Sequence, residues 1–366
     1  MLTALLPRVN RYPMGVNKFQ ILPQRPDSAC EVPWLQMRKV AFAGIGLVVL
    51  LVVLAGLNRA QERRQANPTS AAAGGAIELS GDPGAAALIA ESGCPTAATT
   101  GDSMRTLTSG GVQRTYRLYV PSSYDASKPL PLVLSFHGFG GSARQIEESA
   151  GLVDVAEREG FVLVTPDGTN SPQRWYIYGR SERGYVDDFA FTEDLIDEVS
   201  RLVCIDPARV FATGMSNGAA MSSLLACRTD RIAAIAPVAG SPYSEQLCSD
   251  TGPTPVVAFH GTEDELVPFD GGNGGRFGLA VTPVRENMLG WAEHNGCDLT
   301  LHTERVADDV VLERYTNCDE GADVLLYVVE GGGHTWPGAA YAGRRQDDAT
   351  QSIDASELIW QFFMDH

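Results

Sequence analysis

The chain has 366 residues, 44% of them hydrophobic and 20% charged, which is enough apolar material for one sizeable core. Its formal net charge is −17. Nine of the 28 basic and three of the 45 acidic residues precede residue 65, which leaves 19 basic and 42 acidic residues in the remainder. A body this acidic repels phosphate backbones, so nucleic acid is not an expected partner.

Residues 40–57 form an apolar run, VAFAGIGLVVLLVVLAGL, without a charge. As a helix the run would be about 27 Å long, close to the thickness of a bilayer's hydrocarbon core. Six basic residues precede it and three follow it closely, which predicts a cytoplasmic leader (1–39), a transmembrane signal anchor and an exported body. The alternative is that Met37 is the true start and that the run is a signal peptide. Contact with a membrane through 40–57 is expected only for the uncleaved anchor.

Residues 58–105 are rich in Ala, Gly, Ser, Thr and Pro, which predicts a flexible stalk. Six cysteines follow the apolar run: Cys94, Cys204, Cys227, Cys248, Cys297 and Cys318. An even number in an exported body predicts disulfides, with 15 possible pairings, and buried free thiols are the alternative. No CxxC motif or Cys/His cluster has metal-ligand spacing, so we expect neither a metal nor another cofactor.

Short apolar runs rich in β-branched residues alternate with helical patterns from about residue 106 to the end. Strands are expected at 112–120, 131–137, 161–166, 209–214, 232–240, 255–261 and 324–333. Helices are expected at 143–160, 187–204, 218–227, 284–297 and 349–366. Strands buried on both faces that alternate with helices predict an α/β fold, a doubly wound and mostly parallel sheet with helices on both faces. We therefore assign residues 106–366 to one α/β domain.

Ser216 lies in GMSNG, between a predicted strand and a predicted helix. A tight strand-to-helix turn needs small residues two positions either side of the serine, and it raises the hydroxyl above the sheet. This pattern predicts a nucleophile, and a Gly-rich helix cap is the alternative. The backbone N–H groups of Asn217 and of Phe139, in FHGFGGS, could together stabilise an oxyanion. We interpret His137 in that loop as structural.

Asp264 and His334 each follow a later predicted strand, in FHGTEDELVP and VEGGGHTWPG. A carboxylate at 264 could orient an imidazole at 334. Three other acids, Glu263, Glu265 and Asp270, are alternative candidates for this role. Asp264 could also be an ordinary loop residue without a catalytic role. The order Ser, Asp, His along the chain is that of α/β-hydrolases.

The body resembles a bacterial extracellular esterase family within the α/β-hydrolases. The family includes single-domain polyhydroxybutyrate depolymerases and feruloyl or acetylxylan esterases. The matching motifs are RTYRLYVP, HGFGGSA, TPDG, VDDFAF, GMSNGAAMS, FHGTEDELVPFDGG and GGGHTWPG. The resemblance implies Ser216 as nucleophile, Asp264 as acid and His334 as base, acting on an ester substrate such as an oligoester or an acylated polysaccharide.

The resemblance also implies three disulfides, Cys94–Cys204, Cys227–Cys248 and Cys297–Cys318. The last two would each close a loop of about 20 residues, a size for which a bridge contributes about 3 kcal/mol.

Trp175 and Trp336 are candidates for the pocket wall, with core packing as the alternative for both. We interpret Asp187 and Asp188 as helix-capping residues. Two other functions are compatible with the sequence. One is a binding protein with a hydrolase fold and no activity, although no member of the proposed triad is missing. The other is a serine peptidase of the same fold.

Overall fold

The computed structural model describes residues 94–95, 98–177, 185–240, 248, 251–274, 279–339 and 349–366. The predicted leader (1–39), the apolar run (40–57) and most of the predicted stalk lie outside the described residues. Among the helices that are described, none combines the length and the apolar character needed to cross a bilayer.

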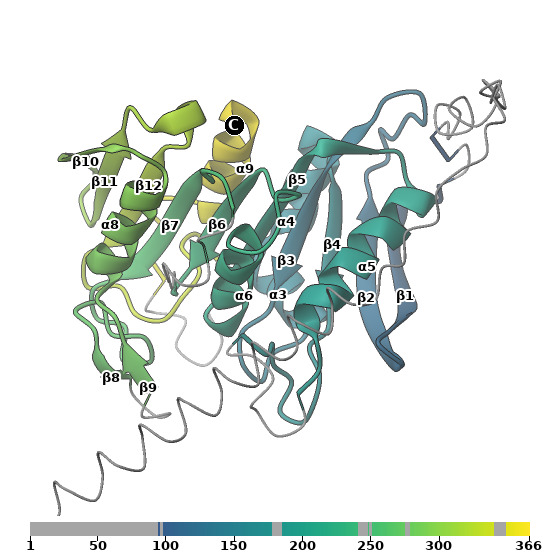
Figure 1. Ribbon diagram of the computed structural model, residues 1–366, viewed down its shortest axis with the longest axis horizontal. Coiled ribbons are helices and arrows are strands. Elements are labelled where there is room, and N and C mark those ends of the chain that lie inside the picture. Colours follow the sequence, from purple (N-terminus) through teal and green to yellow (C-terminus); the bar gives the residue numbers. More distant parts are fainter. Residues whose placement is uncertain are drawn as a thin grey trace, which may run out of the picture. The chain divides into compact units, whose positions relative to one another are not determined.

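A ten-stranded sheet runs through the body (Figure 1). Its strands are β1 (Gly101–Ser109), β2 (Val112–Val120), β3 (Leu130–Phe136), β4 (Val162–Pro166), β5 (Ile205–Met215), β6 (Ala234–Val238), β7 (Val256–Gly261), β10 (Asp298–Ala307), β11 (Val310–Thr316) and β12 (Val324–Val329). The strands β8 (Gly272–Gly274) and β9 (Leu279–Val281) form a separate ribbon. The helices described are α3 (Ala143–Ala150), α4 (Leu152–Glu159), α5 (Asp188–Leu202), α6 (Asn217–Ala226), α8 (Val284–His294), α9 (Ala355–Asp365) and the 3₁₀ helix η2 (Asp319–Gly321).

The strand order is β1-β2-β4-β3-β5-β6-β7-β12-β11-β10. All pairs from β4 to β12 are parallel, and the pairs toward both edges are antiparallel. The chain runs from β3 outward to β4 and then returns to β5 on the other side of β3. The winding direction therefore reverses between β3 and β5. In open α/β sheets, ligands bind at such a reversal, beyond the carboxyl ends of the strands.

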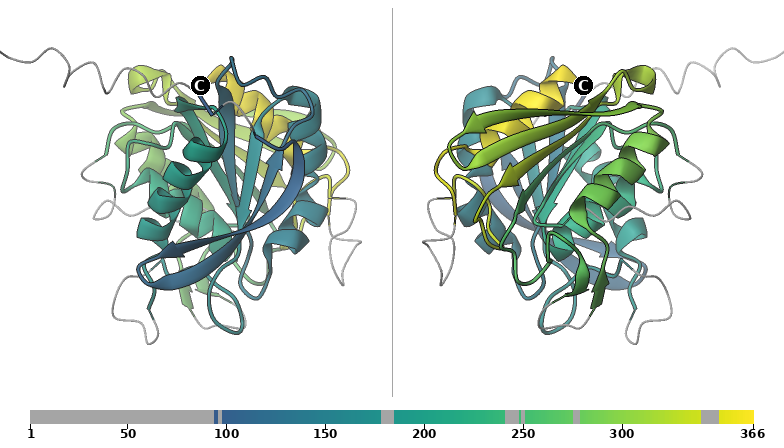
Figure 2. Two further views of the ribbon diagram at one scale, coloured as in Figure 1. Left: turned by 90° about the vertical axis from the view of Figure 1, so that its right-hand side faces the viewer. Right: turned by 90° about the vertical axis from the view of Figure 1, so that its left-hand side faces the viewer.

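Helices cover both faces of the sheet (Figures 1 and 2). Helices α5, α6 and α8 contribute to one apolar core, and α3, α4 and α9 contribute to the other. Because side chains alternate along a strand, Leu132 and Leu134 of β3 enter the first core and Val133 enters the second. This arrangement confirms the predicted doubly wound, mostly parallel sheet.

Two local features differ from the prediction. Residues 143–160, expected as one helix, form α3 and α4 with Gly151 between them at a φ of 67°. Glycine enters this left-handed region without steric cost, so it ends the first helix. The strands β1, β10 and β11 were not predicted. β10 is exposed along almost its whole length, so it lacks the alternation of buried and exposed residues by which strands are recognised.

The folded body begins earlier than the predicted boundary at residue 106. β1 starts at Gly101 and pairs with β2 along its whole length, and Cys94 is bonded to Cys204. The N–H and C=O groups that form such a ladder are present in every residue except proline, which lacks the N–H, so small polar residues can also form a paired strand. The residues before 106 are small and polar, like those of a linker, and for this reason the predicted boundary was placed too late in the sequence.

Disulfides join Cys94 to Cys204, Cys227 to Cys248 and Cys297 to Cys318. These are the three pairs that the family resemblance implied. The first closes a sequence separation of 110 residues, and each of the others closes 21. In the chain-entropy description, a longer closed loop restricts the unfolded chain more strongly.

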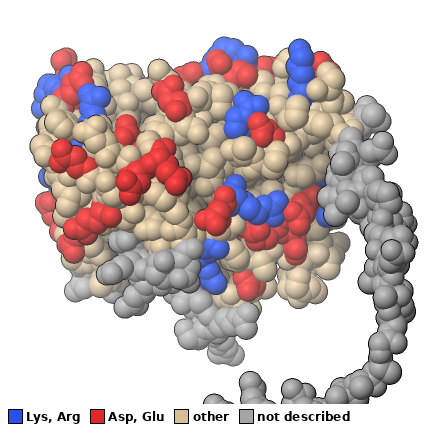
Figure 3. All heavy atoms as spheres, turned by 45° about the horizontal axis from the view of Figure 1, so that its top comes forward, with Lys and Arg blue, Asp and Glu red and all other residues tan. Residues whose placement is uncertain are grey.

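The surface carries charges of both signs. On the face shown in Figure 3, acidic and basic side chains are interspersed. Arg158 with Glu357 and Arg305 with Glu330 are exposed ion pairs, with N–O distances of 2.6 and 2.9 Å. Exposed pairs of this kind contribute little to stability. The stability of the fold therefore comes mainly from its two apolar cores, its backbone ladder and its disulfides.

Replacing both Cys94 and Cys204 by Ala is expected to lower the free energy of unfolding by about 5 kcal/mol, because this bond closes the longest loop. The matched Cys297→Ala, Cys318→Ala variant should lose about 3 kcal/mol. Urea unfolding followed by circular dichroism measures both losses. Equal losses in the two variants would contradict the loop-length argument.

Candidate active site

Ser216 occupies a strained turn between β5 and α6. Its backbone has φ 57° and ψ −115°, a conformation that residues with a side chain rarely adopt. Its N–H donates to the Val238 carbonyl at 2.9 Å, which ties the turn to the end of β6. The serine thus lies at the carboxyl edge of the sheet, directly before the N-terminus of a helix, as predicted.

The glycines two positions either side of Ser216 allow the turn to approach β3. A Cβ at Gly218 would lie 2.0 Å from the Phe136 carbonyl oxygen, and one at Gly214 would lie 2.6 Å from the same atom. Neither separation is sterically possible. The pattern Gly-x-Ser-x-Gly is therefore a requirement of backbone packing between β5, α6 and β3.

Asp264 and His334 form a hydrogen-bonded pair at the same edge. His334 Nδ1 lies 2.7 Å from Asp264 Oδ2, and the carboxylate side chain is 0% exposed. The other oxygen, Oδ1, accepts the N–H groups of Leu266 and Val267, both at 2.8 Å. A carboxylate accepts hydrogen bonds, so Nδ1 of His334 carries the proton and Nε2 is left as the basic nitrogen.

The loops that carry this pair are joined through their backbones. The N–H of Thr262 donates to the Val329 carbonyl, and that of Glu263 donates to the Gly332 carbonyl, both at 2.9 Å. A Cβ at Gly261 would lie 2.1 Å from the Gly332 oxygen. The acid loop after β7 and the histidine loop after β12 therefore form one unit, with glycine required where they touch.

The electrostatics at Asp264 favour the charged form. Burial alone would raise the pKa of this carboxyl, but hydrogen bonds from His260, His334 and the Val267 N–H hold its pKa well below the usual value. The competing acids Glu263, Glu265 and Asp270 are exposed. Among the four candidates, Asp264 is the carboxylate that is buried against His334.

His137 supports the loop after β3 through both of its ring nitrogens. Nε2 accepts the Gly168 N–H at 2.9 Å, so Nδ1 carries the proton and donates to the Gly138 carbonyl at 2.7 Å. Burial is the main reason that the pKa of His137 is lowered. This geometry agrees with the structural role predicted for His137. It also holds the loop that contains Phe139.

Ser216 and His334 line one pocket of about 630 Å³. Gly138, Phe139 and Trp336 line it as well. Its apolar wall also includes Ile146, Met215, Leu266, Val267 and Ala339. The pocket thus brings together the predicted nucleophile, the predicted base, the predicted oxyanion loop and one of the two predicted tryptophans.

Trp175 has a different role from the one predicted. Its side chain is 2% exposed in the core, and its indole Nε1–H donates to the His137 carbonyl at 2.8 Å. Its backbone is bound by the side chain of Asn217: Oδ1 accepts the Trp175 N–H at 2.7 Å and Nδ2 donates to the Trp175 carbonyl at 3.1 Å. Trp175 therefore links Asn217 to the loop after β3 that begins with His137, and it is not among the residues that line the pocket.

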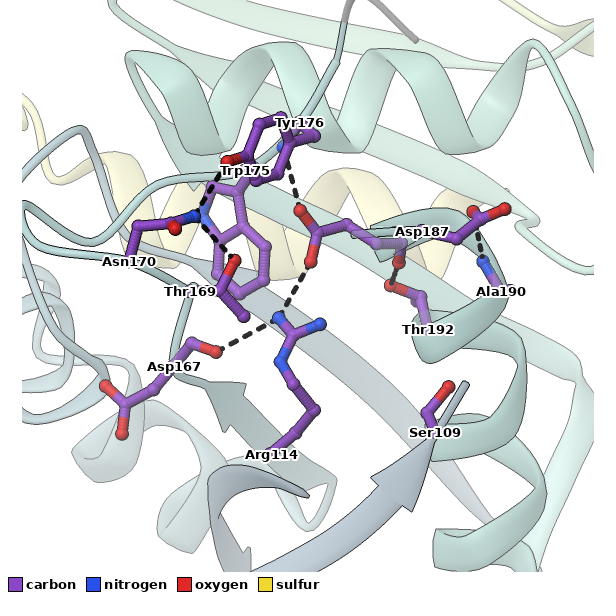
Figure 4. A network of polar contacts seen from close by, with 12 residues as sticks. Ser109, Arg114, Asp167, Thr169, Asn170, Trp175, Tyr176, Asp187, Ala190 and Thr192 are labelled. Carbon is purple, nitrogen blue, oxygen red and sulfur yellow. Dashed lines mark hydrogen bonds and ion pairs between the residues drawn. The ribbon is translucent and has the colours of Figure 1, made fainter. Parts of the chain in front are cut away.

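A buried polar network adjoins Trp175 (Figure 4). Arg114 and Asp188 form an ion pair at 2.8 Å, with side chains 2% and 0% exposed. Asp188 Oδ2 accepts the Tyr176 N–H at 2.8 Å, and the Arg114 guanidinium lies 3.8 Å from the centroid of the Phe191 ring. Burial raises the pKa of Asp188, and the charge of Arg114 offsets part of that rise.

This network corrects the interpretation of the Asp187–Asp188 pair. Asp187 caps α5 as predicted, because its Oδ1 accepts the Ala190 N–H at 3.0 Å. Asp188 instead forms the buried ion pair. An arginine more than 70 residues away in sequence gives no local signal, so adjacent acids before a helix suggested capping for both.

Within the described residues, no group of three or more His, Cys, Asp or Glu side chains is arranged to hold a metal ion. The arrangement that is present suits nucleophilic attack by a hydroxyl. A basic imidazole nitrogen and a serine share one pocket, and the sheet order is that of an open α/β fold with its site at the winding reversal. These features define an α/β-hydrolase.

Comparison with known proteins shows which family of α/β-hydrolases the chain resembles. Residues 114–249 match the family described as Esterase PHB depolymerase. Feruloyl esterase B from Piromyces equi is 33% identical over 224 residues, which are 58% of this chain and 41% of that protein. "Putative esterase NocK" from Nocardia uniformis subsp. tsuyamanensis is 30% identical over 264 residues, which are 64% of this chain and 74% of that protein. Feruloyl esterase D from Neurospora crassa is 27% identical over 300 residues, which are 78% of this chain and 93% of that protein.

The chain belongs to the polyhydroxybutyrate-depolymerase family of esterases, the family that its motifs indicated. It is a carboxylic-ester hydrolase. The chain spans less than half of the length of Feruloyl esterase B and most of the length of the other two relatives.

The low pKa of Asp264 predicts a stability contribution that depends on pH. The pKa is depressed in the folded state and is about 3.9 in an unfolded chain, so the contribution is present above that value and is lost as the pH falls below it. We expect wild type to exceed Asp264→Asn in free energy of unfolding by an amount that shrinks from about pH 6 to about pH 3. Urea titrations measure this difference. A constant difference would contradict the depressed pKa.

Proposed function

We propose that the chain is an exported serine esterase that works through an acyl-enzyme at Ser216. The observation that carries the proposal is the Asp264–His334 hydrogen bond of 2.7 Å, with His334 and Ser216 in one pocket. Because Nδ1 of His334 is bound to the acid, Nε2 is the nitrogen available as a general base.

In the first step, Ser216 Oγ attacks the ester carbonyl carbon and its proton passes to His334 Nε2. The C–O bond to the alcohol then breaks, and the same proton leaves with the alcohol. Asp264 stays ionised, fixes the tautomer of His334 and stabilises the imidazolium. The carboxylate is suited to this role because its surroundings favour the charged form.

In the second step, water attacks the acyl carbon and gives a proton to His334 Nε2. The bond to Ser216 Oγ breaks, the acid leaves and the proton returns to the serine. In both steps the tetrahedral oxyanion accepts hydrogen bonds from the backbone N–H groups of Phe139 and Asn217. The supports for this assignment are the place of Phe139 in the pocket and the place of Asn217 at the N-terminus of α6.

The substrate we propose is an ester of a small acyl group, carried by an oligoester or by an acylated polysaccharide. The apolar residues of the pocket, such as Ile146, Met215 and Trp336, suit an acyl chain or ring. Two of the relatives are feruloyl esterases by name, and the family is that of polyhydroxybutyrate depolymerases.

The disulfide bonds of the body support its export. Three disulfides tie the described body together. Such bonds form and persist in oxidising compartments and are rare in the cytosol. Together with the charges around residues 40–57, they support an extracellular or cell-surface location, reached through either a signal anchor or a signal peptide.

Ser216→Ala should abolish hydrolysis of a short p-nitrophenyl ester, with a loss in kcat of roughly 10⁴-fold or more, because the substitution removes the hydroxyl that would form the acyl-enzyme. Circular dichroism should show an unchanged fold. The same two proteins should be compared on feruloyl, acetyl and 3-hydroxybutyryl esters and on a peptide amide. Retained turnover in the variant would refute the nucleophile.

Asp264→Asn should lower kcat by roughly 10⁴-fold, because an amide cannot stabilise the imidazolium and favours the wrong tautomer of His334. Asp270→Asn is the matched control: Asp270 is exposed on the same segment, and its variant should retain wild-type kcat. The ester assay at saturating substrate measures both. The reverse result would assign the acid to Asp270.

A further inference from the structure

His260 lies in β7, four residues before the acid, and sequence reasoning gave it no role. Its side chain is 1% exposed, and its Nε2 lies 2.8 Å from the Val267 carbonyl oxygen and 3.4 Å from Asp264 Oδ2. The ring packs edge-on to Phe269, with centroids 6.0 Å apart. His260 is therefore enclosed by the same turn that holds the acid.

The hydrogen-bond partners of His260 determine where its proton is. A carbonyl oxygen can only accept, so Nε2 of His260 must carry a hydrogen and donate it to Val267. The same N–H lies near Asp264 Oδ2, which is the oxygen bound by His334. Two imidazole rings therefore approach one carboxylate oxygen, from β7 and from the loop after β12.

We propose that His260 is a positioning residue, which anchors the acid turn through Val267 and shares Asp264 Oδ2 with His334. It does not touch substrate. Its N–H stabilises the Asp264 anion and reduces the attraction that this oxygen offers to the His334 imidazolium. His260 thus sets the strength of the acid–base pair, and this inference rests on the proposed catalytic roles of Asp264 and His334.

Other ionisable groups face this cluster and must be considered. His137 and Glu148 line the pocket with His334, and the exposed Glu263 and Glu265 flank Asp264. The Arg285 guanidinium lies 4.9 Å from the centroid of the Phe269 ring, which His260 also contacts. The strands that pair with β7 contribute no charged side chain: β6 is AIAPV and β12 is VLLYVV. Within this set, His260 is the group that shares an oxygen with His334.

Removing the His260 N–H should therefore strengthen the hold of Asp264 on protonated His334. The pKa of His334 should rise, and the acidic limb of the kcat/KM profile should move to higher pH, on the order of half a pH unit. The turn also loses its anchor at Val267, so kcat should fall about tenfold. KM should change little, because His260 does not contact substrate.

The test compares His260→Leu, which has no N–H, with His260→Gln, whose amide N–H can still donate to Val267. His302→Leu, at an exposed position of β10, is the matched control and should behave as wild type. We expect the shifted acidic limb and the lower kcat in the Leu variant, with recovery of both toward wild type in the Gln variant. A lower kcat with an unmoved acidic limb would reduce His260 to a packing residue and overturn the proposal.

A second measurement does not depend on activity. In the Ser216→Ala background, NMR of ¹⁵N-histidine-labelled protein titrates His334 directly, with and without the His260 substitution. A higher His334 pKa on loss of the N–H is expected, and an unchanged value overturns the inference. If the Leu variant does not fold, His260→Gln and the shorter His260→Asn give the same comparison. Should Ser216→Ala remain active, the proposed function fails, whereas this titration still decides the role of His260.

Discussion

The site depends on one buried carboxylate that must stay ionised. Asp264 has no exposed side-chain surface, and burial by itself disfavours its charge. Two backbone N–H groups on one oxygen and the imidazole of His334 on the other compensate for the lost water. The two N–H groups belong to the same turn as Asp264, whereas His334 reaches the carboxylate only because the loops after β7 and β12 lie side by side, so the parallel pairing of these strands is a condition for the contact between acid and imidazole.

The fold was largely predictable because the central strands are buried on both faces. Continuous apolar runs at β3, β5 and β7 can be read from the sequence, and their alternation with helices implies a doubly wound sheet. β1 was missed because its residues, GDSMRTLTS, do not alternate between apolar and polar types although their burial alternates, and β10 was missed because almost all of its residues are exposed. The break at Gly151 was missed because the helical period of the sequence continues across it.

The catalytic candidates could be proposed from local patterns, whereas their supports could not. Ser216 could be recognised by the glycines on either side of it, which are required because the turn contacts β3. His334 could be recognised because it follows a Gly-rich loop. The supporting contacts could not be predicted, because their partners are distant in sequence or lie in a turn without a recognisable motif. These contacts are made by His260, by the Asn217 side chain and by the Arg114–Asp188 pair. Trp175 was a candidate for the pocket wall with core packing as the alternative, and the structure shows core packing, with the Trp175 backbone hydrogen-bonded by the Asn217 amide.

The bond between Cys94 and Cys204 has a mechanical consequence. Cys204 directly precedes β5, the central strand that ends at Met215 just before Ser216, whereas Cys94 precedes the edge strand β1. Tension applied to the chain before Cys94 passes through the covalent bridge to the middle of the sheet. The outermost strand is thereby shielded from being peeled away, and a pull on the N-terminal side must shear interior strands before the fold gives way.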